Sequence, residues 1–273
     1  MPVNPLLSII TVNLNNLEGL KKTMASVFDQ KFKNFEYIII DGGSKDGSGS
    51  YIESHQKNLN YWVSEPDKGI YSGMNKGIKA STGEYLLFLN SGDYLNNEKV
   101  LKIAAENLDG CDILYGNIMK VYKDGKVILD KGLNGKEITL KVFIEGTIYH
   151  CSAFINKKIF ANYGYYDEKL KIVSDWKLFL IALGLNTSRV SYLDYTFSNF
   201  DMNGISNSNL KLQNQERNSV IDDVVALPIY KDYIKLREIE NILNDTRLKN
   251  FIDTDSNKFS RKLHSIIFRI FLK

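Results

Sequence analysis

Short runs of apolar and β-branched residues alternate with amphipathic segments in the first half of the chain. The runs predict strands at Leu7–Asn13, Phe35–Asp41, Tyr61–Val63, Tyr85–Leu89 and Asp112–Tyr115. After the first strand, apolar residues recur at helical spacing over Leu17–Phe28, and a weaker helical pattern begins near Tyr71. This alternation is typical of an α/β fold in which helices flank a mostly parallel, Rossmann-like sheet.

The pattern changes after Asn117. Met119–Tyr122 and Lys126–Leu129 flank Asp124-Gly125 and predict a β-hairpin. Mixed helix and strand patterns continue to about Asn199, so we expect α+β material packed against the edge of the sheet. From about Leu210 the chain is polar and helical, which predicts a C-terminal helical extension.

The composition is that of an ordinary globular protein. Of the 273 residues, 44% are hydrophobic and 25% are charged, which allows one large core with or without a small satellite domain. The formal net charge of +3 gives no overall field that would attract nucleic acid, and the basic residues are concentrated near the C-terminal end. We therefore expect no nucleic-acid partner.

The cysteines and the N-terminal segment bear on the compartment. Cys111 and Cys151 stand beside apolar residues, and neither their number nor their spacing suggests a disulfide scaffold or a zinc site. We expect two buried free thiols in a reducing compartment. The apolar stretch Leu6–Val12 lacks a basic flank and is too short for a secretory signal or a membrane span, so we expect a cytoplasmic protein.

Three polar clusters follow predicted strands, at residues 41–50, 64–69 and 90–93. Ligands of open parallel sheets bind at the carboxyl ends of the strands. Asp41 can accept hydrogen bonds from a nucleobase or a ribose, and Asp93 can bind a Mg²⁺ or Mn²⁺ ion that bridges two phosphates. Taken singly, each cluster is explained as well by a turn or a helix cap.

Taken together and in this order, the clusters resemble the family 2 glycosyltransferases. The resemblance rests on Ser8–Asn13, Ile40–Ser48, Glu65–Tyr71 and Gly83–Asp93, and it continues more loosely to about Ser206. It implies a GT-A fold and inverting transfer of a sugar from a nucleotide-diphospho-sugar. By family habit the donor is a UDP-sugar, and the acceptor is a hydroxyl of a glycan or a lipid-linked glycan.

The same resemblance implies a domain organisation. A GT-A catalytic domain is expected over residues 1–205, followed by the helical extension over residues 206–273. Within the domain, residues 1–117 form the nucleotide-sugar-binding half and residues 118–205 the acceptor-side half.

Several site residues are assigned by matching positions to the family pattern. Thr11 and Asp41 are expected to hold the nucleobase, Asp67 lies beside the nucleoside, and Asp93 matches the ligand of Mn²⁺ or Mg²⁺ in an Asp-x-Asp-type motif. Further donor contacts are expected from Asn13, Asn90, Ser91, Gly92 and His150. On the residues alone, His150 is explained slightly better as a core histidine with its hydrogen bonds satisfied.

The sequence departs from the family pattern at two places in this half. Asn90 and Gly92 stand where acidic residues are often found, which leaves one carboxylate and lowers the expected metal affinity. Ser72-Gly73 replaces the usual Asp-Ala before Met74-Asn75-Lys76-Gly77, so the acceptor-side contacts of that helix are not assigned.

A transferase of this kind needs a general base to take the proton from the attacking hydroxyl. Val173–Leu178 resembles the later family motif in which an acidic residue opens a helix, and Asp175 matches the base. A helix cap at Ser174 or Asp175 explains the same residues equally well. Asn203–Ser206 resembles a loop that closes over the donor, and a flexible surface loop explains it nearly as well.

The C-terminal segment predicts a basic amphipathic helix. One face carries Phe259, Leu263, Ile266, Ile267, Ile270 and Phe271, and the rest of the surface carries Lys258, Arg261, Lys262, Arg269 and Lys273. Such a helix favours attachment to an anionic membrane surface, here the inner face of the cell membrane. The alternative is a helix docked on the protein's own core.

A catalytically inactive protein that binds nucleotide-sugars is the main alternative function. The presence of Asp41, Asp67, Asp93 and Asp175 at the matching positions favours the enzyme. A dinucleotide-dependent oxidoreductase fits less well, because Asn13-Leu14-Asn15-Asn16 after the first strand contains no Gly-x-Gly-x-x-Gly turn. A nucleotidyltransferase lacks support because no glycine-rich basic loop follows that strand.

Overall fold

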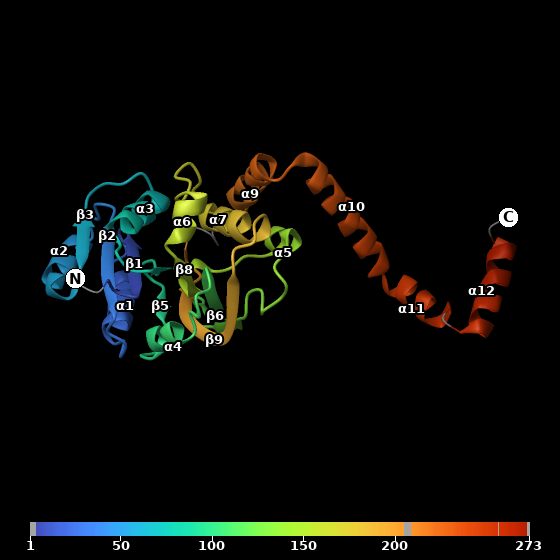
Figure 1. Ribbon diagram of the computed structural model, residues 1–273, viewed down its shortest axis with the longest axis horizontal. Coiled ribbons are helices and arrows are strands. Elements are labelled where there is room, and N and C mark those ends of the chain that lie inside the picture. The colour runs from blue at the N-terminus through green and yellow to red at the C-terminus, as the bar shows by residue number, and fades with distance from the viewer. Residues whose placement is uncertain (1–3, 205–208, 256, 272–273) are drawn as a thin grey trace. The chain divides into compact units, whose positions relative to one another are not determined.

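The computed structural model describes residues 4–204, 209–255 and 257–271 (Figure 1). They belong to two compact units, Met1–Ile221 and Asp222–Lys273. The sequence analysis placed the boundary after residue 205. The compact units divide later, within α9 (Leu210–Val224), which buries Val220 and Ile221; that the catalytic domain spans residues 1–205 stays a prediction.

The first unit contains a nine-stranded sheet in the order β3-β2-β1-β4-β8-β6-β9-β5, with β7 paired to β6. Neighbouring strands are parallel from β3 to β4 and again between β6 and β9, and the other pairs are antiparallel. The strands are β1 (Leu7–Asn13), β2 (Phe35–Asp41), β3 (Tyr61–Ser64), β4 (Tyr85–Phe88), β5 (Tyr94–Leu95), β6 (Ile113–Val121), β7 (Val127–Asp130), β8 (Ala153–Asn156) and β9 (Val190–Asp201).

Both faces of β1, β2 and β4 are buried, which explains the continuous apolar sequence of these strands. Leu7 and Ile9 of β1 pack in one core cluster with residues of α1. Ile10 and Val12 point to the other face, where α3 approaches closely: a Cβ at Gly77 would lie 2.4 Å from Cγ2 of Ile10. The helices of this unit include α1 (Leu17–Phe28), α2 (Ser48–Ser54), α3 (Ile70–Ala80), α4 (Val100–Glu106), α5 (Leu140–Glu145), α6 (Lys158–Tyr163) and α7 (Ser174–Phe179).

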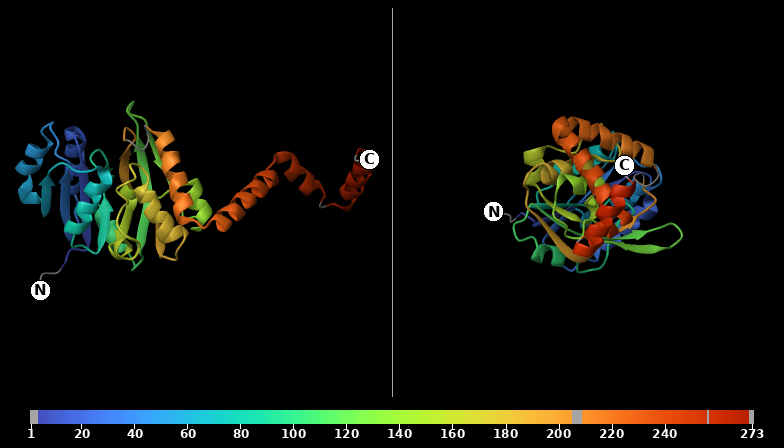
Figure 2. Two further views of the ribbon diagram at one scale, coloured as in Figure 1. Left: turned by 90° about the horizontal axis from the view of Figure 1, so that it is seen from above. Right: turned by 90° about the vertical axis from the view of Figure 1, so that its right-hand side faces the viewer.

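The predicted α/β fold is confirmed, and the acceptor-side half differs from the expectation in one respect. Its strands β8, β6 and β9 continue the same sheet beyond β4 and do not form separate material at its edge. The predicted hairpin is present as β6 and β7, and it extends from the rest of the unit in the right-hand view of Figure 2. Cys111 and Cys151 are free and buried, as expected.

The second unit consists of helices. After the end of α9 follow α10 (Leu227–Leu243), α11 (Thr246–Asp255) and α12 (Lys258–Phe271). The ring of His264 in α12 stacks on Phe251 of α11 at 4.3 Å between centroids, and its Nδ1 lies 3.1 Å from Oδ1 of Asp255. Among the described residues, no helix is both long and apolar enough to cross a membrane.

Candidate active site

The carboxyl ends of β1, β2 and β3 meet at the carboxylate of Asp41. Its Oδ1 accepts hydrogen bonds from Asn13 Nδ2 at 2.7 Å and Ser44 Oγ at 2.6 Å, and its Oδ2 accepts from Ser44 N and from Ser64 Oγ at 2.6 Å. Burial raises the pKa of Asp41, but these hydrogen bonds outweigh it and hold the pKa below its usual value. The carboxylate is therefore ionised and fixed at this edge of the sheet.

Asp67 lies beside this group. Its Oδ1 accepts a hydrogen bond from the backbone N–H of Gly69 at 2.9 Å. Its Oδ2 lies 3.0 Å from the position that a Cβ on Gly42 would occupy and 3.3 Å from that of a Cβ on Gly73. The loop after β3 thus places a carboxylate above the loop after β2 and the first turn of α3, and glycine at both positions leaves it the room.

The turn after β4 brings the third predicted cluster to the same edge. Ser91 N donates to Val12 O of β1 at 3.0 Å, and Gly92 has φ +108°, a conformation that glycine readily adopts. Asp93 is buried, and its Oδ1 accepts a hydrogen bond from Asp201 N at 2.9 Å. Burial raises the pKa of Asp93 to about 7, against the opposing effect of His150.

Asp201, at the end of β9, lies beside Asp93 and is a candidate site residue that the sequence analysis missed. A Cβ on Gly92 would lie 3.0 Å from Asp201 Oδ2, so the space beside Gly92 holds the carboxylate of Asp201. No motif marks Asp201, because more than a hundred residues separate it from Asp93. Only the pairing of β5 with β9 brings the two together.

The donor set at this point fits a hard divalent cation. Mg²⁺ and Mn²⁺ need only one or two protein carboxylates when phosphates supply the remaining oxygens. Asp93 and Asp201 meet that requirement. Within the described part of the chain, no group of three or more His, Cys, Asp or Glu side chains is arranged to hold a metal ion.

Asp175, in the first turn of α7, accepts hydrogen bonds from two distant segments. Its Oδ1 lies 2.9 Å from the hydroxyl of Tyr71 in α3, and its Oδ2 lies 2.9 Å from Nδ1 of His150. The side chains of Asp175 and His150 are each 15% exposed. The N-cap residue of α7, Val173, makes no side-chain cap, and the partners Tyr71 and His150 of the Asp175 carboxylate come from outside α7.

His150 connects Asp175 to the turn after β4. Its Nδ1 faces Asp175, and its Nε2 lies 3.0 Å from Nδ2 of Asn90. A continuous chain of hydrogen bonds therefore runs from Asn90 through His150 to Asp175 and Tyr71. The sequence expectation for His150 was a contact with the donor phosphates, and that contact stays a prediction.

The segment before α7 is held by Glu216 of α9. This buried carboxylate accepts hydrogen bonds from three consecutive backbone N–H groups, those of Lys171 at 2.7 Å, Ile172 at 2.9 Å and Val173 at 3.3 Å. The hydroxyl of Tyr71 also lies 2.6 Å from Ile172 O. Glu216 and Tyr71 thus both hold residues 171–173, and this fixes the start of α7, where Asp175 lies.

Other candidates lie elsewhere or are not described. Thr11 is fully buried, and its hydroxyl pairs with that of Tyr37 at 3.0 Å, so its assignment to a nucleobase stays a prediction that this position does not favour. Of the predicted donor loop, Asn203 and Gly204 are described, and Ile205 and Ser206 lie outside the described residues.

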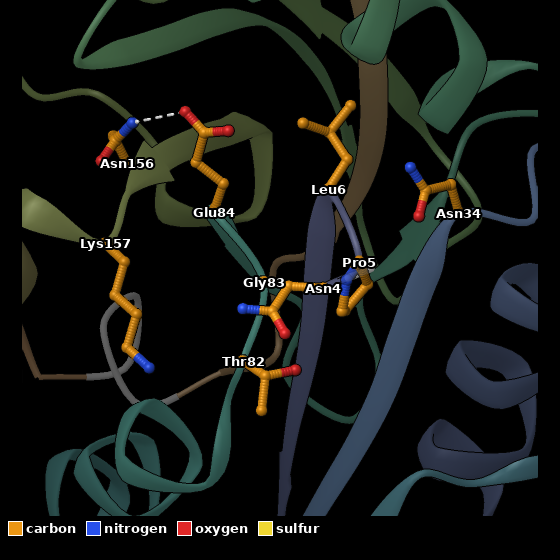
Figure 3. Close-up of a pocket in the computed structure, with 9 residues that line it drawn as sticks. All are labelled: Asn4, Pro5, Leu6, Asn34, Thr82, Gly83, Glu84, Asn156 and Lys157. Atoms are coloured by element: carbon orange, nitrogen blue, oxygen red, sulfur yellow. Dashed lines mark hydrogen bonds between the residues drawn. The ribbon is translucent and has the colours of Figure 1, made fainter. Parts of the chain in front are cut away.

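A cavity of about 460 Å³ lies at the opposite end of the parallel strands (Figure 3). Leu6, Asn34 and Gly83, which line it, precede or begin β1, β2 and β4. Asp41 ends β2 and Asn90 follows β4, so both lie at the carboxyl ends of these strands. This cavity is therefore separate from the edge of the sheet at which Asp41, Asp67 and Asp93 lie.

Comparison with known proteins identifies the family. The family described as Glycosyl transferase family 2 matches residues 8–164. An uncharacterized glycosyltransferase of Mycobacterium tuberculosis (strain H37Rv) is 34% identical over 184 residues, which cover 65% of this chain and 69% of that protein. A PGL/p-HBAD biosynthesis glycosyltransferase of Mycobacterium bovis (strain BCG) is 26% identical over 216 residues, which cover 75% of this chain and 80% of that protein.

Two solved structures share the fold. S. aureus TarS 1-349 in complex with UDP-GlcNAc has a TM-score of 0.60 at 23% identity, over 71% of this chain and 58% of that chain. The mannosyltransferase PcManGT from Pyrobaculum calidifontis in complex with GDP-Man and Mn²⁺ has a TM-score of 0.62 at 14% identity, over 100% of this chain and 82% of that chain. The match thus spans less than two thirds of TarS 1-349. Because the family match extends over more than half of its residues, the chain belongs to glycosyl transferase family 2 and is a glycosyltransferase.

Proposed function

We propose that the chain transfers a sugar, with inversion at the anomeric carbon, from a nucleotide-diphospho-sugar to a hydroxyl of a glycan or lipid-linked glycan. UDP is the expected nucleotide, and TarS, which shares the fold, has been solved with UDP-GlcNAc. The observation that carries the proposal is the hydrogen-bonded chain from Asn90 to Asp175. It joins a candidate base to the edge where Asp41, Asp67 and Asp93 gather.

Asp175 is suited to act as the general base. Burial raises the pKa of Asp175, but the hydrogen bond and charge of His150 and the hydrogen bond from Tyr71 outweigh it and lower the pKa. The carboxylate is thus ionised at neutral pH. Tyr71 contacts one oxygen of the carboxylate and His150 the other, and a carboxylate has about four lone-pair positions, so acceptor capacity remains for the acceptor hydroxyl.

The reaction then needs few groups from this chain. As the acceptor oxygen bonds to the anomeric carbon, its proton passes to Asp175, and the electrons of the breaking bond go to the departing nucleoside diphosphate. His150 and Tyr71 orient the carboxylate during this transfer. A divalent ion held by Asp93, with Asp201 beside it, would supply the positive charge that stabilises the departing diphosphate.

A donor-binding protein without catalytic activity is the second candidate. It would use Asp41, Asp67 and Asp93 in the same way but would need no oriented base. The two hydrogen bonds on the Asp175 carboxylate favour transfer. Product formation from a nucleotide-sugar selected by thermal-shift screening separates the two functions, because both bind the donor.

We also propose that α12 attaches the protein to an anionic membrane at the inner face of the cell membrane. Phe259 is 76% exposed, and Leu263, Ile266 and Ile267 are 42–48% exposed. Residues 257–273 carry basic side chains and no acidic one. Both features suit a helix lying in the headgroup region. The predicted apolar face also includes Ile270 and Phe271, whose side chains lie outside the described part of the chain.

We expect Asp175→Asn to lower the turnover number by about 10²–10⁴-fold while the affinity for the donor changes little, because only the proton acceptor is lost. Turnover is measured by release of the nucleoside diphosphate, and donor binding by calorimetry. Asp167→Asn is the matched control, since Asp167 pairs with Lys177 on the same segment. Near-normal turnover of Asp175→Asn would remove the base from the mechanism.

The interaction free energy between His150 and Asp175 should depend on pH. Burial lowers the pKa of His150, but the hydrogen bond and charge of Asp175 and the charge of Asp93 outweigh it and raise the pKa. The raised pKa of His150 stabilises the fold below the unfolded histidine value of about 6.5, and this is lost as pH rises through the folded value. The lowered pKa of Asp175 stabilises it above about 3.9, and this is lost as pH falls through the folded value.

We therefore expect the interaction free energy of His150 and Asp175 to be largest at about pH 5–6 and to decline as the pH rises through the raised pKa of His150. A double-mutant cycle of His150→Gln and Asp175→Asn in urea measures it, with about 0.5–3 kcal/mol expected at the maximum. Asp93 is present in all four proteins, so most of its own titration cancels. An interaction free energy independent of pH would show that the pair does not titrate as proposed.

Removal of divalent ions should stop transfer. We expect EDTA to abolish activity and Mn²⁺ or Mg²⁺ to restore it, because Asp93 and Asp201 are the proposed ligands of an ion that stabilises the departing diphosphate. Calorimetric titration of Mn²⁺ into the protein saturated with UDP gives a second readout, and Asp93→Asn and Asp201→Asn should each weaken it. Asp194→Asn, on the same strand as Asp201, is the control. Full activity in metal-free buffer would contradict the assignment.

Deletion of residues 258–273 should abolish binding to vesicles that contain anionic lipid, since both the apolar face and the basic residues are removed. Cosedimentation with anionic and zwitterionic vesicles measures this. Arg261→Gln with Lys262→Gln should weaken binding to anionic vesicles alone. If the truncated and full-length chains sediment equally, α12 is not the membrane-binding element, and docking on the protein itself is favoured.

A further inference from the structure

Arg217 of α9 lies against the residue that follows the proposed base. Its guanidinium carbon is 4.9 Å from the centre of the Trp176 ring. Trp176 is buried, and its Nε1 donates to Phe143 O at 2.7 Å, so the ring is held rigidly. A cation is therefore placed on the fixed aromatic ring of the residue that follows Asp175 in the chain.

The guanidinium has no polar partner in the described part of the chain. Its Nε is buried and makes no hydrogen bond there. The neighbouring carboxylate of Glu216 is already engaged by three backbone N–H groups. Buried charged donors are normally paired, because their desolvation is costly. Arg217 thus has donors available for a ligand.

The electrostatic environment agrees with this position. Burial lowers the pKa of Arg217, and the charge of Asp175 acts in the opposite direction. Asp175 is therefore an electrostatic neighbour of the guanidinium, although the two form no ion pair. Glu216, the preceding residue, is hydrogen-bonded to the segment that leads into α7.

We propose that Arg217 binds an oxyanion of the acceptor, a phosphate or a carboxylate close to the hydroxyl that Asp175 deprotonates. A guanidinium stacked on an aromatic ring retains its planar set of donors and can give two parallel hydrogen bonds to such a group. This inference rests on the proposed function, because it takes Asp175 as the base and therefore as the contact of the acceptor hydroxyl.

The position of Arg217 favours the acceptor over the donor diphosphate. The proposed diphosphate site is at Asp93 and Asp201, and it connects to Asp175 through Asn90 and His150. Arg217 contacts none of these connecting residues and packs on Trp176 instead. It belongs to the surroundings of the base, where the acceptor must approach.

The two tryptophans of the chain allow a direct binding test. In a Trp62→Phe background, Trp176 is the single tryptophan and reports ligands that approach Arg217. The probes are hexyl phosphate and hexanoate, with hexanol as the uncharged control, each added to the protein saturated with UDP and Mn²⁺. The variants are Arg217→Met, which preserves packing on the ring, Arg217→Lys, which keeps the charge, and Lys211→Met, a control on the same helix.

We expect one or both anionic probes, and not hexanol, to change the fluorescence of Trp176. Arg217→Met should weaken that binding about tenfold or more, since a charge-assisted pair of hydrogen bonds is lost. Lys211→Met should leave it unchanged, and Arg217→Lys should retain part of it. UDP affinity, measured by calorimetry, should change by less than about twofold in all variants. Melting temperatures establish that each variant is folded.

Three outcomes would overturn the proposal. They are an absence of any Arg217-dependent response to both probes, equal binding of hexanol, and a loss of UDP affinity in Arg217→Met that matches its loss of probe affinity. The last result would assign the cation to the donor diphosphate. If neither the unmodified chain nor any variant binds UDP, the proposed donor site is wrong. Hexyl phosphate and hexanoate, added without UDP and Mn²⁺, then still test whether Arg217 binds an oxyanion.

Discussion

The site depends on a carboxylate that is nearly buried and still ionised. Asp175 keeps its charge in this position because His150 and Tyr71 hydrogen-bond to it from two other segments. An ionised group without such partners would either take up a proton or move toward water. These hydrogen bonds tie α3, the segment before β8 and α7 to one point. They also determine which lone pairs of the carboxylate remain available to a substrate.

Much of the nucleotide-binding half could be predicted from the sequence, because its signals are local. The strands that end at Asn13 and Asp41 are continuous apolar runs, and a parallel sheet necessarily brings their carboxyl ends to one edge. The hairpin after Asn117 followed from Asp124-Gly125 for the same reason. Asp175 was assigned by resemblance, and the residues alone did not separate a base from a helix cap.

What the sequence did not predict depends on contacts between distant segments. Asp201 reaches Asp93 only through the pairing of β5 with β9, and Glu216 reaches the segment before α7 only through the packing of α9. In the sequence, His150 stands among apolar residues, as an ordinary core residue does. Its hydrogen bonds to Asn90 and Asp175 join segments that are far apart in the chain, so the sequence alone does not reveal them. The extension of the sheet by β8, β6 and β9 was missed because short mixed strands carry no signal of which sheet they join.

These contacts explain why Asn90 and Gly92 stand where the family often has acidic residues. A carboxylate at position 92 would need a Cβ within 3.0 Å of Asp201 Oδ2, and it would place like charges together in a region where burial already raises the pKa of Asp93. Glycine avoids both problems and permits the positive φ of the turn. At position 90, an amide pairs with the imidazole of His150 without adding a further charge beside Asp175. The motif itself therefore keeps one carboxylate, that of Asp93, and β9 contributes a second one, that of Asp201. The number of negative charges near the expected diphosphate thus depends on the tertiary structure as well as on the motif.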